Sequence, residues 1–316
     1  MSGHVLGFDI GGTNIRGALL DAKGDVIATN RRSRPFSPED MLDAVADLAA
    51  GLNAQADGSL AALGLGCAGC VNNEGVVLTS PNIPSLVHFP LKSELEARFG
   101  VPVVAENDAT TATWAEAKTG AGEGYKDIVF VAFGTGIGGG FVIDGELRRG
   151  SHGLAGEIGH MIIDPSGPAC VCGRHGCWEQ MASGGALGRL ARDAAAKGRA
   201  PTIVAEAGGN VDDIQGEHVA KLLAKGDPVA RALLVDLAHQ IAIGLNNLVN
   251  VLDPEVIVIG GGLSDIGDVF FDAVRRGFDE VMVDRLRRPE LPILGASHGG
   301  LAGALGAGLL VRDLVA

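Results

Sequence analysis

The stretch VLGFDIGGTNIRGALLDAKG (Val5–Gly24) has a near copy later in the chain, DIVFVAFGTGIGGGFVIDGE (Asp127–Glu146). Each copy contains an apolar strand, a Gly-Thr turn, a second strand and an acidic-glycine turn. When Gly12-Thr13 is laid on Gly134-Thr135, Gly17 falls on Gly139. Glycine-rich hairpins are common, so chance is one explanation, but the shared offsets favour duplication. We therefore predict an α/β protein made of two copies of one unit that face each other across a cleft lined by glycine turns.

Helix and strand signals alternate around both hairpins. A serine cap and an acidic first turn predict a helix in SPEDMLDAVADLAAGLNAQ (37–55). Apolar runs predict buried strands, and periodic segments predict further helices. The strands are LAALGLGCAG (60–69), VPVVAEND (101–108) and EVIVIGGGL (255–263), and the helices are LKSELEARFG (91–100), DPVARALLVDLAHQIAIGLNNLVNVL (227–252) and GGLAGALGAGLLV (299–311).

The bulk composition is that of an ordinary globular protein of about two domains, with 316 residues, 47% hydrophobic and 20% charged. Glycine is the outlier, with 49 residues, about twice the usual share of roughly 7%. A formal charge of −13 argues against a nucleic-acid partner, because such binding depends on cationic side chains that neutralise phosphates. The negative net charge is still compatible with a small anionic ligand that is held by backbone amides.

The chain shows no targeting or membrane signal at this level. Its start, MSGHVLGFDIGG, has neither a basic leader nor a signal-type apolar run, and apolar stretches such as LAGALGAGLLV (301–311) are far below spanning length. We therefore expect a cytoplasmic protein that does not bind a membrane. In such a reducing compartment, clustered thiols bind metal more often than they form disulfides.

The turn after the first strand has the composition of a phosphate site. Asp9 ends the strand, and Gly11, Gly12 and Thr13 follow. Backbone amides and the threonine hydroxyl would bind phosphate oxygens, and the carboxylate suits Mg²⁺, directly or through water. A plain hairpin turn explains the same residues. The turn matches neither GxxxxGKS nor a strand-to-helix GxGxxG, so both of those nucleotide-binding folds are disfavoured.

Two more glycine turns follow apolar strands. Gly134, Thr135 and Gly136 repeat the first turn without its acid, and Gly260, Gly261 and Gly262 lie between a strand and a helix. In α/β proteins the carboxyl end of a strand is where a ligand approaches backbone closely. Together with the first turn, they predict one nucleotide held from two sides.

With these motifs, the chain resembles the sugar kinases of the ROK family (repressor, open reading frame, kinase), within the actin-like, hexokinase-like ATPase superfamily. The likeness runs from about Val5 to Val311. It includes DIGGT (9–13), ENDAT (106–110), GTG (134–136), the glycines at 260–262 and the Cys/His stretch at 159–177. The resemblance implies two actin-like, ribonuclease H-like ATPase domains. We expect a smaller one at 1–120 with the C-terminal helix 299–316, and a larger one at 121–298, with a hinge in AKTGAGEGYKD (117–127).

The resemblance also implies an activity, which is phosphorylation of a hexose at its 6-hydroxyl by ATP with Mg²⁺. Asp108 would be the base that accepts the hydroxyl proton. A helix N-cap is the alternative reading of Asp108. The implied sugar contacts are Asn82, Asn107, Asp108, Glu157, His160 and Glu179. Without the resemblance, Asn82 is a turn residue and the two glutamates are solvated charges.

The stretch GHMIIDPSGPACVCGRHGC (Gly159–Cys177) contains a candidate metal site. His160, Cys170, Cys172 and Cys177 are a Cys₃His set, typical of structural zinc, and Gly173 and Gly176 would allow a tight turn. The Cys-x-Cys spacing is tighter than usual, but the ROK signature has the same order. Redox chemistry would leave one of three thiols unpaired, and His175 is a rival ligand. The zinc would brace the carboxylates of Glu157 and Glu179, while His160 faces the sugar with its second nitrogen, as the resemblance implies.

The resemblance leaves several alternatives. Glucose is the expected hexose, from likeness to the family's ATP-dependent glucokinases, but N-acetylmannosamine, N-acetylglucosamine, fructose and allose kinases share these motifs. Some relatives use polyphosphate. The family's transcriptional regulators carry a DNA-reading domain ahead of the kinase-like body, for which this chain leaves no room before Asp9. A non-catalytic zinc scaffold would show decayed phosphate turns. We expect a homodimer or homotetramer, and we assign no role to Cys67 and Cys70, expected to be buried.

Overall fold

The computed structural model describes residues 3–283 and 287–315, which form two compact units. The first unit comprises residues 1–126, 140–156 and 297–316, and the second comprises 127–139 and 157–296. These units are groups of residues in mutual contact. Residues 140–156 fall in the first unit, together with the N-terminal part of the chain. The predicted domain division instead places these residues in the larger domain, 121–298. The predicted domain limits stay a prediction.

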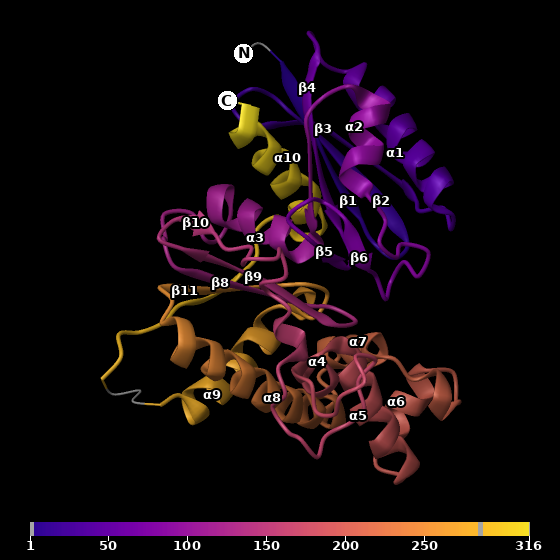
Figure 1. Ribbon diagram of the computed structural model, residues 1–316. Coiled ribbons are helices and arrows are strands. Elements are labelled where there is room, and N and C mark those ends of the chain that lie inside the picture. Colours follow the sequence, from indigo (N-terminus) through magenta and orange to yellow (C-terminus); the bar gives the residue numbers. More distant parts are fainter. Residues whose placement is uncertain (1–2, 284–286, 316) are drawn as a thin grey trace. The chain divides into compact units, whose positions relative to one another are not determined.

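The first unit is built on a five-stranded mixed sheet of order β3-β2-β1-β4-β7 (Figure 1). β1, β4 and β7 are parallel, and β2 is antiparallel to both β1 and β3. Its elements are β1 (His4–Ile10), β2 (Asn14–Leu20), β3 (Val26–Ser33), α1 (Pro38–Asn53), β4 (Leu60–Cys67), β5 (Cys70–Val71), β6 (Val77–Thr79), α2 (Leu91–Phe99), β7 (Val103–Asn107), α3 (Asp108–Thr119), β10 (Glu146–Leu147), a 3₁₀ turn (Gly299–Leu301) and α10 (Ala302–Val315).

The second sheet repeats the plan of the first. Its order is β10-β9-β8-β11-β12, so in both sheets three consecutive strands lie side by side and two later strands follow beside the first of them. β8, β11 and β12 are parallel, as β1, β4 and β7 are. The duplication predicted from the two hairpins is therefore confirmed at the level of topology. The bounds are β8 (Ile128–Phe133), β9 (Ile137–Ile143), β11 (Val256–Gly260) and β12 (Ile293–Gly295).

Helices make up most of the rest of the second unit. They are α4 (Trp178–Ala182), α5 (Gly184–Ala196), α6 (Pro201–Glu206), α7 (Gly216–Ala224), α8 (Pro228–Leu252) and α9 (Asp268–Val281), with 3₁₀ turns at Ile158–His160, Val211–Asp213 and Ser264–Ile266. By length and composition α8 is a helix that could cross a membrane, so the expectation that no segment reaches spanning length is wrong for it. It contacts α4, α5, α7 and α9, and its apolar side is buried, which is the setting of a core helix.

Small residues let α10 pack directly on the first sheet. A Cβ at Gly7 or Gly64 would collide with the carbonyl oxygens of Ala304 and Ala307, and a Cβ at Gly306 would collide with Thr111 of α3. The glycines of the C-terminal helix therefore allow its backbone to approach neighbouring elements closely. This close packing places the start of α10 next to β1 (Figure 1).

A buried carboxylate fastens the end of α3 to the segment before α10. Glu116 is fully buried. Its carboxylate accepts hydrogen bonds from the backbone amides of Ala121, Ser297 and His298, at 2.9–3.0 Å. Three charge-assisted bonds compensate the burial of this carboxylate. They hold together two parts of the first unit that are far apart in the sequence.

Candidate active site

The carboxyl ends of three parallel strands meet at one edge of the first sheet. In the register, Ile10 of β1 lies opposite Cys67 of β4, which in turn lies opposite Asn107 of β7. The phosphate-type turn at 11–13 and Asp108 follow directly after two of these strands. The structure therefore brings together Asp9, the glycine turn and Asp108, as ligand sites in α/β folds require.

The turn itself is a tight connection between β1 and β2. The amide of Gly11 donates to the carbonyl of Asn14 at 2.9 Å, and the Asn14 side chain donates to the Thr13 hydroxyl. Thr13 is exposed, and Gly11 and Gly12 are half-buried. A Cβ at Gly12 would lie 3.4 Å from the side chain of Asn82, so the predicted sugar contact lies beside the phosphate turn.

The surroundings of the Asp9 side chain disfavour its charged form. Burial and the nearby carboxylate of Asp108 raise its pKa to about 7, and Arg16, whose Nη1 lies 3.4 Å from Oδ2, opposes the rise. Gly303 at the start of α10 packs against the same carboxylate, where a side chain would not fit. Two carboxylates that repel in a buried setting are a suitable place for a divalent cation, so the residues fit the predicted Mg²⁺.

Asp108 is the first residue of α3, and Asn107 is its N-cap. The Asn107 side chain accepts from the Thr110 amide at 3.0 Å, so the alternative reading of Asp108 as the cap is wrong. Oδ1 of Asp108 accepts from the Ala109 amide at 2.9 Å and from Nδ2 of Asn107 at 3.1 Å. These bonds hold Oδ1 of the carboxylate in place.

The glycine turns of the second unit also come together. The amide of Gly184, at the start of α5, donates to the carbonyl of Gly134 at 2.8 Å. Gly261 has a φ of +82° and packs against the backbone of Phe133, which accepts a hydrogen bond from the Leu263 amide. The turn at 134–136 and the glycines at 260–262 are thus neighbours, as a shared nucleotide site requires.

Glu179 is not the solvated charge that its sequence alone suggests. Its Oε2 accepts from the amide of Ile137 at 3.1 Å, and a Cβ at Gly136 would collide with it. Glu179 therefore braces the turn at 134–136, and its predicted contact with the sugar stays a prediction. Glu157, at the start of the same segment as His160, is exposed within its unit.

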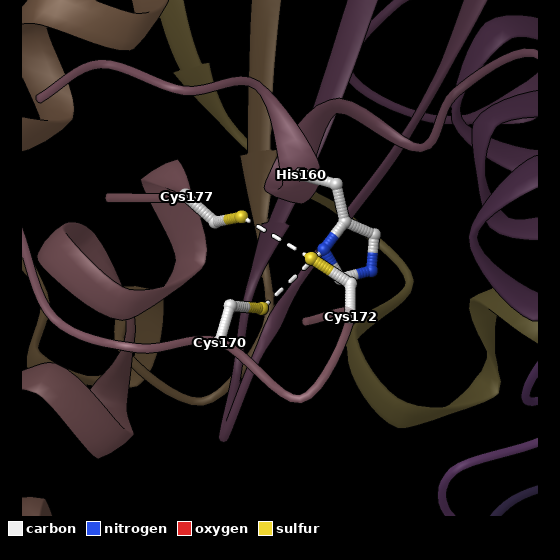
Figure 2. A group of neighbouring side chains, drawn as sticks. All are labelled: His160, Cys170, Cys172 and Cys177. Carbon is white, nitrogen blue, oxygen red and sulfur yellow. Dashed lines mark hydrogen bonds between the residues drawn. The ribbon is translucent and has the colours of Figure 1, made fainter. Parts of the chain in front are cut away.

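The four predicted metal ligands converge (Figure 2). One ring nitrogen of His160 and the sulfurs of Cys170, Cys172 and Cys177 all lie within 4.8 Å of one another. Nδ1 of His160 lies 3.7 Å from the Cys170 sulfur, and the sulfurs of Cys172 and Cys177 lie 3.5 Å apart. Tetrahedral zinc with Zn–S bonds of about 2.3 Å needs sulfurs roughly 3.8 Å apart. The donor set and its spacing therefore fit zinc.

The loop that carries the cysteines turns as predicted. Gly173 and Gly176 have φ values of +83° and +68°, which favour glycine, and a Cβ at Gly176 would overlap the carbonyl of Asp164. His175, the rival ligand, instead faces the Gly167 carbonyl at 3.2 Å. Burial raises the pKa of the Cys177 thiol to about 12, so a bound metal would be needed to hold it as a thiolate.

Several residues near the site carry no motif that would have identified them. Arg149 forms an ion pair with Glu106, and burial raises the pKa of the Glu106 carboxyl. The side chain of Arg34 donates a hydrogen bond to the carbonyl of Gly12. Cys67 is fully buried at the strand edge, where burial and the carboxylates of Asp108 and Asp9 raise its pKa, while Cys70 is only half-buried, contrary to expectation. No disulfide joins any of the five cysteines, all of which are described.

The sequence matches known proteins over nearly its whole length. The family model described as "ROK family" matches residues 5–314. The chain belongs to the ROK family. It is 40% identical to a glucokinase of Streptomyces coelicolor over 314 residues, 98% of each chain. An N-acetylmannosamine kinase of Escherichia coli is 33% identical over 311 residues, again 98% of each.

A solved structure of the family matches the whole fold. A ROK family glucokinase from Streptomyces griseus, in complex with glucose and AMPPNP, is 40% identical, with a TM-score of 0.87 over 98% of this chain and all of that one. The predicted fold class, an α/β fold of the actin-like ATPase type, is therefore confirmed.

Proposed function

We propose that this chain is an ATP-dependent hexose kinase that phosphorylates glucose at its 6-hydroxyl. The observation that carries the proposal is the convergence of Asp9, the glycine turn and Asp108 where β1 and β7 end side by side with β4. The 40% identity to glucokinases over nearly the whole chain supports glucose as the acceptor.

Asp108 has the chemistry of the general base. A sugar hydroxyl is a poor nucleophile at neutral pH, so a carboxylate must accept its proton as the new P–O bond forms. The bonds from Ala109 and Asn107 hold Oδ1 in place, which orients the carboxylate before the sugar arrives. Asn82, Asn107, Glu157, His160 and Glu179 would bind the other hydroxyls.

The glycine turns would hold the nucleotide. Amides of Gly11, Gly12 and Thr13 would donate to phosphate oxygens, with Gly134, Thr135 and Gly136 as the second turn and Gly260, Gly261 and Gly262 on the adenosine side. Asp9 would hold Mg²⁺, which neutralises charge that builds up on the transferring phosphoryl group.

The Cys₃His set would hold a structural zinc. Ligation through Nδ1 of His160 leaves Nε2 of the same ring for the sugar. Zinc supplies no catalytic step in this scheme, and its four bonds would fix the segment between Glu157 and Glu179.

The test is a coupled assay of ADP release with ATP, Mg²⁺ and a panel of hexoses. We expect glucose to give the highest kcat/KM, and polyphosphate should not replace ATP. Absence of turnover with every sugar would refute the kinase. Preference for N-acetylmannosamine would support the second candidate, which the 33% identical relatives suggest.

Replacing Asp108 tests the base directly. Asp108→Asn keeps the shape of the side chain but cannot accept the proton, so kcat should fall by about 10²–10⁴-fold. Glucose affinity, measured by calorimetry, should stay within a few-fold of wild type. Asp57→Asn, an exposed carboxylate in a turn, is the control and should change neither value. Near-normal turnover of the Asp108 variant would remove it as the base.

A cytoplasmic location and a homodimer or homotetramer complete the proposal. Neither a nucleic acid nor a membrane is a partner in it. Sedimentation of the purified protein distinguishes the dimer, the tetramer and the monomer by mass.

A further inference from the structure

Arg34 lies just past the end of β3 and reaches the phosphate turn with its side chain. Its Nε and Nη2 both donate to the carbonyl of Gly12, at 3.1 and 2.8 Å. Nη1 donates to the carbonyl of Pro35 at 2.6 Å, and the backbone amide of Arg34 donates to the carbonyl of Thr13 at 2.8 Å. One residue therefore binds two successive carbonyls of the turn that would hold ATP.

The two hydrogen bonds from Nε and Nη2 of Arg34 to the Gly12 carbonyl, here called the fork, also fix the direction of the next amide. In a planar trans peptide the C=O of one residue and the N–H of the next point in opposite directions. Holding the Gly12 carbonyl towards Arg34 therefore directs the amide of Thr13 to the other side of the turn. A glycine at this position gives the backbone little resistance to peptide rotation, so an outside contact is needed to select one orientation.

The position of the guanidinium also matters electrostatically. Arg34 opposes the rise in the pKa of Cys67, the same thiol that responds to Asp9 and Asp108, so its charge acts in the region of both carboxylates. A half-buried cation there favours an anionic ligand over water.

We propose that Arg34 is a positioning residue for the nucleotide, which sets the Thr13 amide towards a phosphate oxygen by its two hydrogen bonds to Gly12. This inference rests on the proposed kinase function. It predicts that loss of the side chain weakens nucleotide binding much more than sugar binding.

Sugar binding should survive because the loop of Asn82 has its own anchors. The Ser80 hydroxyl donates to the carbonyl of Ala68 and accepts from the Ile83 amide at 3.0 Å, and Ile83 and Leu86 are buried. None of these contacts involves Arg34. The backbone bond between Arg34 and Thr13 also stays in any Arg34 variant, so the substitution removes the fork without removing the strand pairing.

The experiment measures binding of AMPPNP with Mg²⁺ and of glucose, separately, by calorimetry on the full chain. For Arg34→Ala we expect AMPPNP affinity to fall on the order of tenfold, since charged hydrogen bonds are lost, and glucose affinity to stay within about twofold. Steady-state kinetics should show the same split, with a higher KM for ATP and a similar KM for glucose. Arg34→Lys, which cannot form the fork, should regain only part of the affinity.

Two controls separate positioning from a general loss of charge or stability. Arg32→Ala removes the same charge two residues away, at an exposed pair with Asp47, and should bind both ligands as wild type does. Added methylguanidinium should restore AMPPNP binding to Arg34→Ala more than sodium chloride at equal ionic strength. Melting temperatures of both variants should lie close to that of wild type.

Unchanged AMPPNP affinity in Arg34→Ala would overturn the role proposed for Arg34. An equal loss of affinity for AMPPNP and glucose, with a lower melting temperature, would do the same. Neither result would overturn the kinase function. A wild-type protein that binds glucose but not AMPPNP would overturn both this inference and the ATP-dependent kinase. Rescue by methylguanidinium together with a selective nucleotide defect would support it.

Discussion

Asp9, the proposed ligand of Mg²⁺, lowers the stability of its own fold when it is ionised. Its carboxylate lies between buried strands, with Asp108 nearby and a single arginine at 3.4 Å. The folded chain binds a proton at Asp9 more tightly than an unfolded chain would, since the pKa rises from 3.8 to about 7. Ionising Asp9 therefore costs folding free energy, which a cation bound at the site would offset.

Asp9→Asn should stabilise the metal-free protein, by an amount that depends on pH. Because the folded pKa is the higher one, wild type loses stability as pH rises from about 4 to about 7, and the loss is constant above that. The neutral amide avoids this loss. We expect the variant to gain about 2–4 kcal/mol over wild type at pH 8, much less at pH 4, and to be inactive as a kinase.

Melting temperatures of both proteins, without Mg²⁺ and nucleotide, at pH 4, 6 and 8, test this. A difference that does not grow with pH, or that favours wild type at pH 8, would contradict the assigned burial and charge environment of Asp9. Asp57→Asn, at an exposed turn, should show no such trend.

At the residue scale, motifs predict candidate ligand contacts better than they predict the residues that would position them. Asp9, Asp108 and the Cys₃His set follow strands or glycine turns in recognisable order. Arg34 has no such signal, because its proposed role depends on the exact register of β2 and β3 and on the direction of its side chain, which need coordinates. Glu179 is predicted from the family resemblance only as a sugar contact, and its bond to the Ile137 amide needs coordinates.

At the element scale, the cysteine loop is held by short contacts that do not depend on the metal. The Cys170 amide donates to the carbonyl of Arg174, the Gly176 amide donates to that of Pro168, and the Trp178 amide donates to that of Met161. Trp178 is fully buried next to Phe133. The loop is thus anchored at its end by α4, while its tip, with Cys172, is exposed.

Removal of the metal should loosen this loop and the sugar site together. We expect about one zinc per chain by mass spectrometry in the wild type and in Cys70→Ser, whose thiol is outside the cluster, and little in Cys172→Ser. Loss of a structural metal should lower the melting temperature by about 5–10 °C and glucose affinity on the order of tenfold.

Treatment of wild type with a zinc chelator should reproduce the Cys172→Ser result, and added zinc should reverse it. A fall in melting temperature without a change in glucose affinity would show that the metal site does not brace the residues from Glu157 to Glu179. Zinc in Cys172→Ser equal to that in wild type would show that the ligand set is wrong.

Most elements were predictable because apolar period and caps agree with the tertiary structure. Ser37 caps α1, as its sequence indicates, and α8 begins after the cap Asp227, within the helix predicted at 227–252. The exceptions have tertiary causes. α8 has the length and apolarity of a membrane span because helices pack around it, and the glycines of α10 reflect its contact with β1 and β4.

At the scale of the whole molecule, the predicted sugar contacts are divided between the two compact units. Asn82, Asn107 and Asp108 belong to the first, and Glu157, His160 and Glu179 belong to the second. A bound sugar stabilises local structure around each residue that it contacts.

Hydrogen exchange measured by mass spectrometry tests this division. Glucose at about 100 times its Kd should slow exchange by up to about a hundredfold wherever local opening releases the sugar. We expect this protection at residues 82–86 and 107–111 of the first unit and at 157–160 and 177–180 of the second. The helices α1 and α7, which contain no predicted contact, should change little. Protection confined to one unit would mean that the three contacts in the other unit are wrongly assigned, even if the protein phosphorylates glucose. Without protection at Glu157, His160 and Glu179, the cysteine loop would have no part in sugar recognition.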